Sequence, residues 1–537
     1  MASSVVGIGT GGELLGAAVL ATVVAAAGGA VALARLNWRG TFAAAPALVA
    51  LALLPFAAAA VWPFAAAVLA GSLREYWRSE DIRKGQDKGR RARAAIGPVT
   101  LGLNARDRRR IDDGTRSGCY ALGTDDTGAV TWLPLGVDQG RHTLVIGATG
   151  AGKTTTMLAA AASHVRAGAG LVVIDAKGDR SVANSLRNLA STTDRPFRLF
   201  TLAGESCCWN PLARGTASER ADKLIAAEDW TETHYKRFYQ RYLLTAFAAV
   251  EARGDTPDIA KVVELLRPES LAFYAREIDD EQATARVDRY LAELTDHERR
   301  DLAGLRNRVA LLAEGEHASL LHQADDGLDL FSSITQGDIA LFSLNASRYP
   351  ETAQLLGAAI FQDLQHVVGL LEANESRQRP ALIVVDEFGA LDQDHVLALF
   401  QRARSAGLSL TLGTQELADL ARVAPGFQDQ VLGNVETVIA HRQNVPVSAE
   451  LVAEIAGTRA TWIHSFQTHP TWRGGRDALG PGNKHRGFEF VIAPDTVKQL
   501  GVGETIVITK NPHHVSRTHV RAPFALHDRE ENRDRRR

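Results

Sequence analysis

Eight consecutive residues form a loop that could bind a chain of phosphates. The segment Gly147-Ala-Thr-Gly-Ala-Gly-Lys153-Thr154 matches G-x-x-x-x-G-K-[ST], and it follows a short apolar run and precedes a helix-like stretch. Glycines let the backbone curl so that successive N–H groups point at the phosphates, and the following helix adds its partial positive charge. The alternative is a glycine-rich turn without a ligand. The nucleotide-binding residues predicted from this motif are Gly147, Ala148, Thr149, Gly150, Ala151, Gly152, Lys153, Thr154 and Thr155.

Two side chains of this loop would supply charge and a metal ligand. Lys153 brings a positive charge to the β- and γ-phosphates, and the Thr154 hydroxyl can ligate Mg²⁺. The predicted ligands are therefore ATP and Mg²⁺. A phosphate-binding loop by itself indicates a nucleotide and not a reaction, so acidic residues elsewhere in the chain must decide the chemistry.

Two adjacent carboxylates end an apolar run at residues 381–385. Asp386 has the position of an aspartate that holds the Mg²⁺ shell, and Glu387 is the candidate general base for the attacking water. Adjacent acids at the end of a strand can also be simple solvated residues. In a chain that carries a phosphate-binding loop, a buried-looking strand that ends in Asp-Glu favours the catalytic interpretation.

Two further polar segments follow apolar runs. Gln415 is predicted to sense the γ-phosphate or to position water, because ligands of open α/β sheets lie at the carboxyl ends of the strands. Its alternative role is a helix cap beside Thr414. The segment Asp175-Ala-Lys177-Gly-Asp179 could be only a turn and helix N-cap, or it could lie near the nucleotide.

A sheet must position these residues. From Thr143 onward apolar runs alternate with longer helical stretches, which predicts an α/β fold with a parallel sheet covered on both faces. Residues 221–323 contain only helix-spaced apolar positions, so an all-α insertion is predicted there; helices of the main sheet are the alternative. The predicted strands are Leu144–Ile146, Leu171–Ile174, Arg198–Leu202, Ile339–Ser343, Leu382–Val385, Ser409–Leu412 and Val438–Ala440.

Composition limits the remaining choices. With 537 residues the chain is long enough for more than one folding unit. Its net charge of -2 excludes a globally basic protein, so any contact with nucleic acid must be local. The three cysteines, Cys119, Cys207 and Cys208, form neither a disulfide framework nor a C-x-x-C metal spacing, which indicates a reduced, cytosolic environment.

Residues 1–72 are predicted to be a membrane anchor. Leu14–Leu33 and Phe42–Leu69 are apolar stretches, each long enough to cross about 30 Å of hydrocarbon. A cleavable signal peptide is disfavoured because residues 1–12 carry no positive charge and a second span follows. Residues 73–140 are predicted to be a basic juxtamembrane linker, which should stay cytoplasmic, followed by short β-like runs. Residues 527–537 are expected to be a disordered charged tail.

Taken together, these motifs resemble those of the type IV secretion coupling proteins, the TraD/TraG-like conjugation ATPases within the FtsK/HerA-like P-loop motors. The match runs over most of the chain, and the strand ending Asp-x-Lys-Gly is shared by the wider group. The segments that carry the resemblance are Gly147–Thr154, Asp175–Asp179, Trp209–Leu212, Asp386-Glu387, Arg404–Gln415, Phe488–Phe490, Lys510–Pro512, the helical insertion and the N-terminal spans.

The resemblance implies a RecA-like motor domain formed by residues 141–220 and 324–526, an all-α domain at residues 221–323, and a ring of six subunits around a DNA channel. In such rings an arginine from the neighbouring subunit completes the site. Arg404 matches the position of that arginine, Arg402 is the close competitor, and an ordinary exposed helix arginine is the alternative.

The implied partners are DNA, expected to be single-stranded and bound to a relaxase, the relaxosome, and the channel proteins of a type IV secretion system. The implied location is the inner membrane of a bacterium, with two spans and most of the protein in the cytoplasm. The Gly-rich basic segment 473–486 could face nucleic acid, although a solvated loop is the favoured interpretation.

Three other functions remain open. An FtsK-like translocase of double-stranded DNA would share the motor and the anchor, but the helical insertion and the Asn210-Pro-Leu212 segment favour conjugation. A protein-exporting secretion ATPase usually strings several ATPase modules together, and this sequence has one complete P-loop. A non-enzymatic scaffold is hard to reconcile with Lys153, Thr154, Asp386 and Glu387 in one chain.

Overall fold

The computed structural model describes residues 115–116, 118–136, 140–226, 233–373, 379–391, 393–423, 426–465, 468–470, 476–478 and 483–521. They all belong to the compact unit that begins at Arg106. The predicted anchor at residues 1–72 and the predicted tail at residues 527–537 lie outside the described part. Within that part, no helix has both the length and the apolar character needed to cross a bilayer.

Seven parallel strands form the centre of the sheet, in the spatial order β10, β4, β9, β8, β5, β7, β6. All seven predicted strands are confirmed, with ends that differ by at most two residues. Such strands read as continuous apolar runs because helices cover both of their faces. The strand bounds are β4 Thr143–Ile146, β5 Gly170–Asp175, β6 Phe197–Thr201, β7 Ile339–Ser343, β8 Ala381–Asp386, β9 Leu408–Thr414 and β10 Thr437–Ala440.

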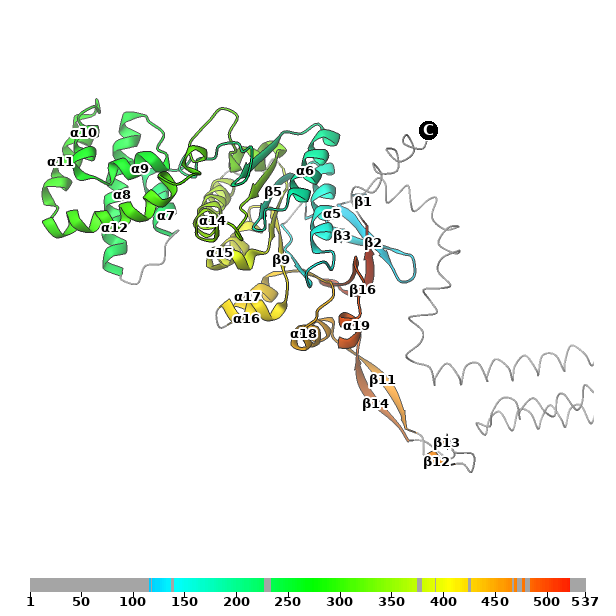
Figure 1. Ribbon diagram of the computed structural model, residues 1–537. Helices are drawn as coiled ribbons and strands as arrows, with labels where there is room; N and C mark the ends of the chain where they lie inside the picture. The colour runs from blue at the N-terminus through cyan, green and yellow to red at the C-terminus, as the bar shows by residue number, and fades with distance from the viewer. Residues whose placement is uncertain are drawn as a thin grey trace, which may run out of the picture. The chain divides into compact units, whose positions relative to one another are not determined.

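Alternate residues of these strands enter two separate hydrophobic cores. Val145, Leu171 and Val384 pack on one face with the helices α5 (Lys153–Arg166) and α6 (Arg180–Thr193). Leu144, Val172 and Val385 pack on the other face with α14 (Pro350–Ala373) and α15 (Gln393–Ala403). Figure 1 shows these two pairs of helices on opposite sides of the sheet. The predicted parallel sheet covered on both faces is confirmed.

Antiparallel strands extend the sheet beyond β10. β15 (Glu504–Lys510) pairs with β10, β16 (His513–Val520) pairs with β15, and β2 (Cys119–Asp125) pairs with β16. β2 also pairs with β1 (Thr115–Arg116) and with β3 (Val130–Pro134), so the described part of the region predicted to hold short β-like runs does form strands. Our strand prediction missed the β15–β16 hairpin, because β16 is rich in His, Ser, Arg and Thr and shows no apolar run.

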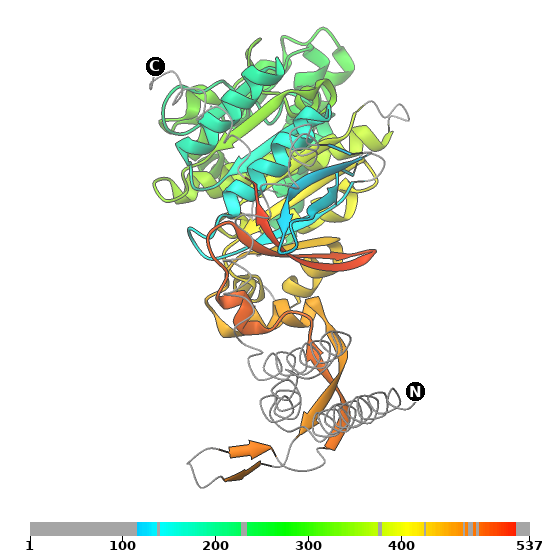
Figure 2. The same cartoon turned by 90° about the vertical axis from the view of Figure 1, so that its right-hand side faces the viewer.

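A two-stranded ribbon stands apart from the main sheet. β11 (Thr458–Ser465) pairs antiparallel with β14 (Asn483–Phe490), and their connection contains the small pair β12 (Thr468–Pro470) and β13 (Arg476–Ala478). Figure 2 shows the ribbon in orange, projecting away from the sheet and its helices. The favoured interpretation of residues 473–486 as a solvated loop was wrong for β13 and for the start of β14, which are strands.

Every described element from Ala217 to Leu320 is helical. Thr295 and Glu298 form a reciprocal capping box at the start of α12, and Asp258 and Asp280 cap α9 and α11 through their side chains. The segment leaves the sheet after β6, and the contact of Trp209 with Leu328 marks where the chain returns. Its helices are α7 Ala217–Ala226, α8 Thr233–Arg253, α9 Ile259–Leu265, α10 Pro268–Ala275, α11 Glu281–Glu293, α12 Asp296–Ala313 and the short η2 Ala318–Leu320.

A buried ion pair connects this helical segment to a helix that packs on the sheet. Lys223 of α7 lies 2.6 Å from Asp363 of α14, and the two side chains are 6% and 9% exposed. The Lys223 ammonium also donates hydrogen bonds to the carbonyls of Pro211 and Arg214. Removal of one member of a buried pair leaves the other charge without a partner in a medium that solvates it poorly.

We therefore expect Lys223→Met to lower the free energy of unfolding by about 3 kcal/mol in urea titrations. Lys261→Met is the matched control, because Lys261 forms an exposed pair with Glu264 that should contribute less than about 1 kcal/mol. Equal effects of the two substitutions would contradict a stabilising role for the buried pair.

Candidate active site

The phosphate-binding loop lies between β4 and α5 at the carboxyl edge of the sheet. Gly150 and Gly152 have φ angles of 75° and 113°, which L-residues with side chains rarely adopt. A Cβ on Gly147 would lie 2.5 Å from the Cβ of His441, so a side chain cannot be accommodated there. The predicted reason for glycine at these positions, a tightly curled backbone, is thus found.

Only some amides of the loop are available to a ligand. Gly147 and Ala148 donate their N–H groups to the carbonyls of Gln415 and Arg442, at 3.1 and 2.9 Å. The N–H groups of Gly150 and Gly152 have no acceptor within the described residues. The first-turn amides of α5, from Lys153 to Thr155, lack helical acceptors by geometry. These amides form the expected anion site at the start of the helix.

Lys153 closes the loop from the inside. Its side chain is 5% exposed, and its ammonium group donates a hydrogen bond of 2.6 Å to the carbonyl of Gly147. The same nitrogen lies 3.3 Å from Oε1 of Glu387. The charge is therefore held between the loop and the end of β8, where phosphate oxygens would meet it.

Asp386 and Thr154 form a pair suited to a divalent cation. The Thr154 hydroxyl donates to Oδ2 of Asp386 at 3.3 Å, whereas the buried Oδ1 has no hydrogen-bond partner among the described residues. A Cβ on Gly413 of β9 would lie 2.8 Å from that oxygen, so the glycine preserves the space beside it. An unsatisfied carboxylate oxygen next to a hydroxyl fits Mg²⁺, which takes oxygen ligands.

Glu387 sits in an unusual backbone conformation. Its φ and ψ of 54° and 45° lie in the left-handed region, which costs roughly 1–2 kcal/mol for a residue with a side chain. Such strain occurs at functional sites, where surrounding contacts fix it. Lys177 donates a hydrogen bond of 2.6 Å to Oε1 of Glu387, and the amide of Gln415 donates one of 3.2 Å to Oε2.

The two carboxylates have opposite acid–base properties. Burial and then the charge of Glu387 raise the pKa of Asp386. Burial also acts to raise the pKa of Glu387, but the hydrogen bond from Lys177 and the charges of Lys153 and Lys177 outweigh it and bring that pKa below its usual value. Glu387 is therefore ionised at neutral pH, as a proton acceptor must be.

Gln415 lies where the sequence placed it. Its amide nitrogen binds Glu387, and its carbonyl oxygen accepts a hydrogen bond of 3.3 Å from the Thr149 hydroxyl. The side chain thus joins the tip of the loop to the second carboxylate. Its hydrogen bonds go to these two residues and not to the helix α16 (Leu417–Val423), so the helix-cap alternative is not found.

The segment from Asp175 to Asp179 combines both roles that the sequence left open. Asp175 accepts hydrogen bonds from the backbone amides of Lys177 and Asp179, and Asp179 caps α6 through the amide of Ser181. The Lys177 side chain meanwhile reaches Glu387. Burial, with the nearby charge of Asp386, raises the pKa of Asp175 to about 6.

Arg404 is not brought to this site within its own chain. It is exposed and lies in the turn that precedes β9, whereas Gln415 directly follows the last residue of β9. A seven-residue strand separates the two ends by about 20 Å. Its competitor Arg402 is also exposed and lies at the same remote edge.

Sequence reasoning missed a buried histidine behind the loop. His441 follows β10 and is fully buried; its Nε2 lies 2.9 Å from the Thr156 hydroxyl, and its Nδ1 lies 3.1 Å from the carbonyl of Glu504. Burial lowers the pKa of His441 to about 4. The ring is therefore neutral, with Nδ1 donating to Glu504 and Nε2 accepting from Thr156. Gly503 donates its N–H to Ala151 at 3.0 Å, so the missed hairpin braces the loop.

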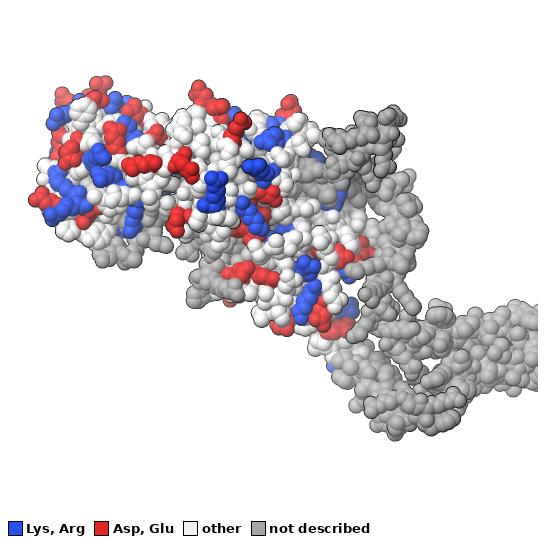
Figure 3. Space-filling model, in the orientation of Figure 1, with Lys and Arg blue, Asp and Glu red and all other residues white. Residues whose placement is uncertain are grey.

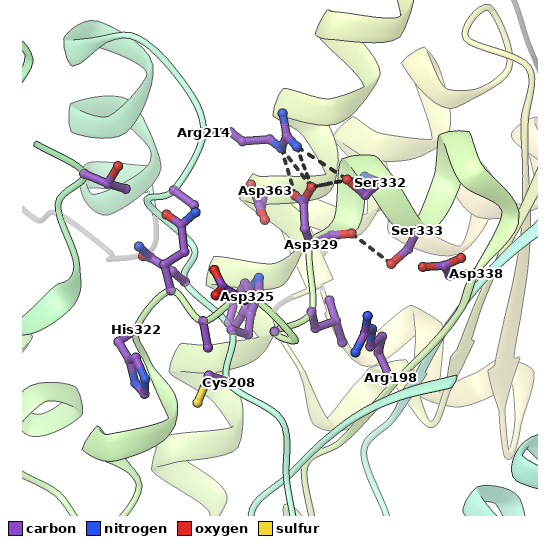
Figure 4. A pocket seen from close by; sticks show the side chains of 18 of the residues that line it. Arg198, Cys208, Arg214, His322, Asp325, Asp329, Ser332, Ser333, Asp338 and Asp363 are labelled. Atoms are coloured by element: carbon purple, nitrogen blue, oxygen red, sulfur yellow. Dashed lines mark hydrogen bonds and ion pairs between the residues drawn. The ribbon is translucent and has the colours of Figure 1, made fainter. Parts of the chain in front are cut away.

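A cavity of about 530 Å³ lies apart from these residues, where the helical segment joins the sheet. Figure 4 shows charged side chains around it, including the pair Arg214 and Asp329, whose nearest atoms are 2.6 Å apart. None of the residues that line it belongs to the phosphate-binding loop or to the carboxylate pair. The size of this cavity therefore does not indicate where the catalytic residues lie.

Two protein-family models match the chain. The model for the TraM recognition site of TraD and TraG matches residues 380–500, which include Asp386, Glu387 and Gln415. The model for the helicase HerA-like C-terminal region matches residues 122–195, which include the phosphate-binding loop. An uncharacterized protein of Mycoplasma pneumoniae is 31% identical over 110 residues, which are 20% of this chain and 72% of that protein.

Solved structures of a bacterial conjugative coupling protein, TrwBdeltaN70, share the fold. The unbound monoclinic form aligns with a TM-score of 0.52 at 15% identity, covering 77% of this chain and 90% of that chain. The trigonal form in complex with sulphate aligns with a TM-score of 0.50 at 16% identity, covering 71% and 86%. The RecA-like α/β fold expected from the sequence is thereby confirmed.

One family model matches the phosphate-binding loop, and the other matches the carboxylate pair and Gln415. In the fold, these two parts of the site lie at the same edge of the sheet. The resemblance to the type IV coupling-protein-like P-loop motors, predicted from the sequence, is thereby confirmed.

Proposed function

We propose that this protein is a membrane-anchored motor that hydrolyses ATP to move DNA into a type IV secretion channel. The observation that carries the proposal is the position of Glu387, an ionised carboxylate held by Lys177 and Gln415 beside Lys153 of the phosphate-binding loop. This set of groups can bind a triphosphate and take a proton from water. The resemblance to conjugative coupling proteins supports DNA as the moving substrate.

Each side chain has a role in the proposed hydrolysis. Lys153 and the free loop amides bind the β- and γ-phosphates, and Thr154 with Asp386 would hold Mg²⁺. Bound Mg²⁺ neutralises charge on the phosphate oxygens. Glu387 accepts the proton of the attacking water, and Gln415 orients that water through its contact with Glu387. Lys177 keeps Glu387 ionised.

The role of Lys177 predicts a shift in the pH dependence of hydrolysis. The hydrogen bond and charge of Lys177 lower the pKa of Glu387, while burial acts to raise it. Lys177→Ala removes the lowering contribution, so the pKa of Glu387 should rise. The ionised form of Glu387 is the active one. As the solution is acidified, the Lys177→Ala protein should therefore lose kcat at a higher pH than the wild type does. Arg180→Ala, at an exposed residue nearby, is the control, and an unchanged acid limb would rule out this role.

The exposed edge that carries Arg404 supports a ring in which this arginine completes the site of the next subunit. A guanidinium that reaches the γ-phosphate stabilises transition-state charge, which is worth about 10³-fold or more in kcat in GTPases. Arg404→Ala should therefore lower kcat in assembled hexamers and leave ATP affinity of the monomer unchanged. Arg402→Ala is the matched control. If Arg404→Ala lowered the kcat of the monomer as much as the kcat of the hexamer, action in trans would be contradicted.

The two apolar stretches in residues 1–72 support an anchor with two spans in the inner membrane of a bacterium. The proposed substrate is single-stranded DNA bound to a relaxase, delivered by a relaxosome to the secretion channel. The direct test is ATP hydrolysis by the purified full-length protein with and without DNA. Hydrolysis that is insensitive to DNA would refute translocation, and no hydrolysis in assembled rings would refute the motor itself.

A further inference from the structure

The ribbon formed by β11 and β14 carries exposed aromatic rings on one of its faces. Phe488 is 74% exposed and Phe490 is 40% exposed, and both belong to β14. Residues directly opposite each other share a face, so Phe490 lies with Thr458, Phe488 with Ala460, and Arg486 with Trp462, which is 57% exposed. The neighbouring residues, Arg459 and Glu489, form an ion pair on the other face.

The sequence of this ribbon and its connection is basic. Residues 458–490 contain five Lys or Arg and two Asp or Glu, a net charge of +3. The whole chain, by contrast, contains 60 Lys or Arg and 62 Asp or Glu. Figure 3 shows the rest of this view of the molecule with blue and red side chains interspersed. Arg486 is exposed and forms no ion pair with any described residue. The ribbon is thus locally basic in sequence, in a chain that is not basic as a whole, and Arg486 is its exposed cation beside the rings.

Resting on the proposed function, we infer that the aromatic face of this ribbon binds single-stranded DNA by stacking of unpaired bases. Arg486, Phe488 and Phe490 alternate along β14 on one face, about 7 Å apart. Rings spaced along a basic strand are the usual platform for single-stranded nucleic acid, because every base has a face that can stack and the cations neutralise phosphates. Paired bases are already stacked on each other and cannot use the rings in this way.

The alternatives fit these observations less well. A protein interface concentrates its energy in anchors that enter well-packed pockets, whereas these rings stand on a ribbon that projects from the sheet (Figure 2). A bilayer would have to accept the exposed pair of Arg459 and Glu489 at the level of the rings. Two strands alone are of marginal stability in water, which further indicates that this face is covered when the protein works.

The test measures DNA binding by the full-length protein in detergent, using the fluorescence anisotropy of a labelled oligothymidine and of a labelled duplex. Phe488→Ala should weaken binding of the oligothymidine about tenfold and change duplex binding little, because one stacked base is lost. Arg486→Ala should instead lower the slope of log binding constant against log salt concentration, by the amount expected for about one phosphate contact, with both DNAs. Phe273→Ala is the matched control, since Phe273 is a 65% exposed phenylalanine on α10.

Three outcomes would overturn the inference: no binding of the oligothymidine by the wild-type protein, equal effects of Phe488→Ala and Phe273→Ala, or equal weakening of single-stranded and duplex DNA by Phe488→Ala. A benzoylphenylalanine photo-crosslinker at position 488 provides the second readout. Adducts with the oligothymidine support the inference, and adducts only with a second copy of the chain or with lipid contradict it. Basal ATP hydrolysis is measured in the same samples, so a failed motor with intact binding remains distinguishable from a failed binding site.

Discussion

Glu387→Gln should lower kcat for ATP hydrolysis by at least about a hundredfold and leave the affinity for ATP close to that of the wild type. The substitution keeps the size of the side chain and an oxygen that can accept the hydrogen bond from Lys177. It removes the carboxylate that takes the proton of water. Phosphate release at saturating ATP and binding of a fluorescent nucleotide analogue measure the two quantities separately.

Glu293→Gln is the control, because Glu293 forms an exposed ion pair with Arg241 in the helical segment. A kcat for Glu387→Gln within about threefold of the wild type would show that another group accepts the proton. The backbone offers a further distinction. Glu387→Gly removes the left-handed strain and should not destabilise the fold at this position, yet hydrolysis should still be lost. Glu387→Gly should therefore lose ATP hydrolysis without losing stability.

The central sheet was predictable because its strands are buried on both faces. β8 is apolar from Ala381 to Val385, and every residue of it is buried, so its sequence shows the strand directly. The β15–β16 hairpin and the β11–β14 ribbon were not predictable in this way, because at least one strand of each carries polar residues on solvent-facing positions. A pattern of apolar residues indicates which positions are buried. Edge strands have few buried positions, so their sequences show little of this pattern.

The site shows the same division between local and tertiary information. The loop from Gly147 to Thr154 and the pair Asp386 and Glu387 are contiguous motifs, whose spacing indicates their chemistry. Lys177 and Glu387 are 210 residues apart, and their contact depends on the register of β5 and β8, in which Asp175 lies opposite Asp386. Likewise, His441 meets Thr156 only because β10 pairs with β4. No spacing in the sequence encodes either contact.

Lys153→Ala should abolish DNA transfer between cells and weaken ATP binding roughly ten- to a hundredfold, the loss expected for a charge-assisted contact. The fold should tolerate the change, because Glu387 keeps Lys177 as its partner when the Lys153 ammonium is removed. An unchanged melting temperature would verify this. Lys153→Arg should also fail, since the side chain is buried against Gly147 and has no room for a guanidinium. Lys261→Ala, at a partly exposed lysine of the helical segment, is the control.

The same Lys153→Ala strain distinguishes the coupling function from its nearest alternative. A motor that feeds a secretion channel predicts loss of DNA transfer with normal segregation of the chromosome, whereas an FtsK-like translocase predicts the reverse. Loss of segregation with intact transfer would therefore overturn the secretion role but keep the motor. If both processes are retained although the Lys153→Ala protein no longer hydrolyses ATP, the nucleotide site serves neither of them. Lys153 is the group expected to hold the γ-phosphate during its cleavage, so a process driven by that cleavage should stop when Lys153 is removed.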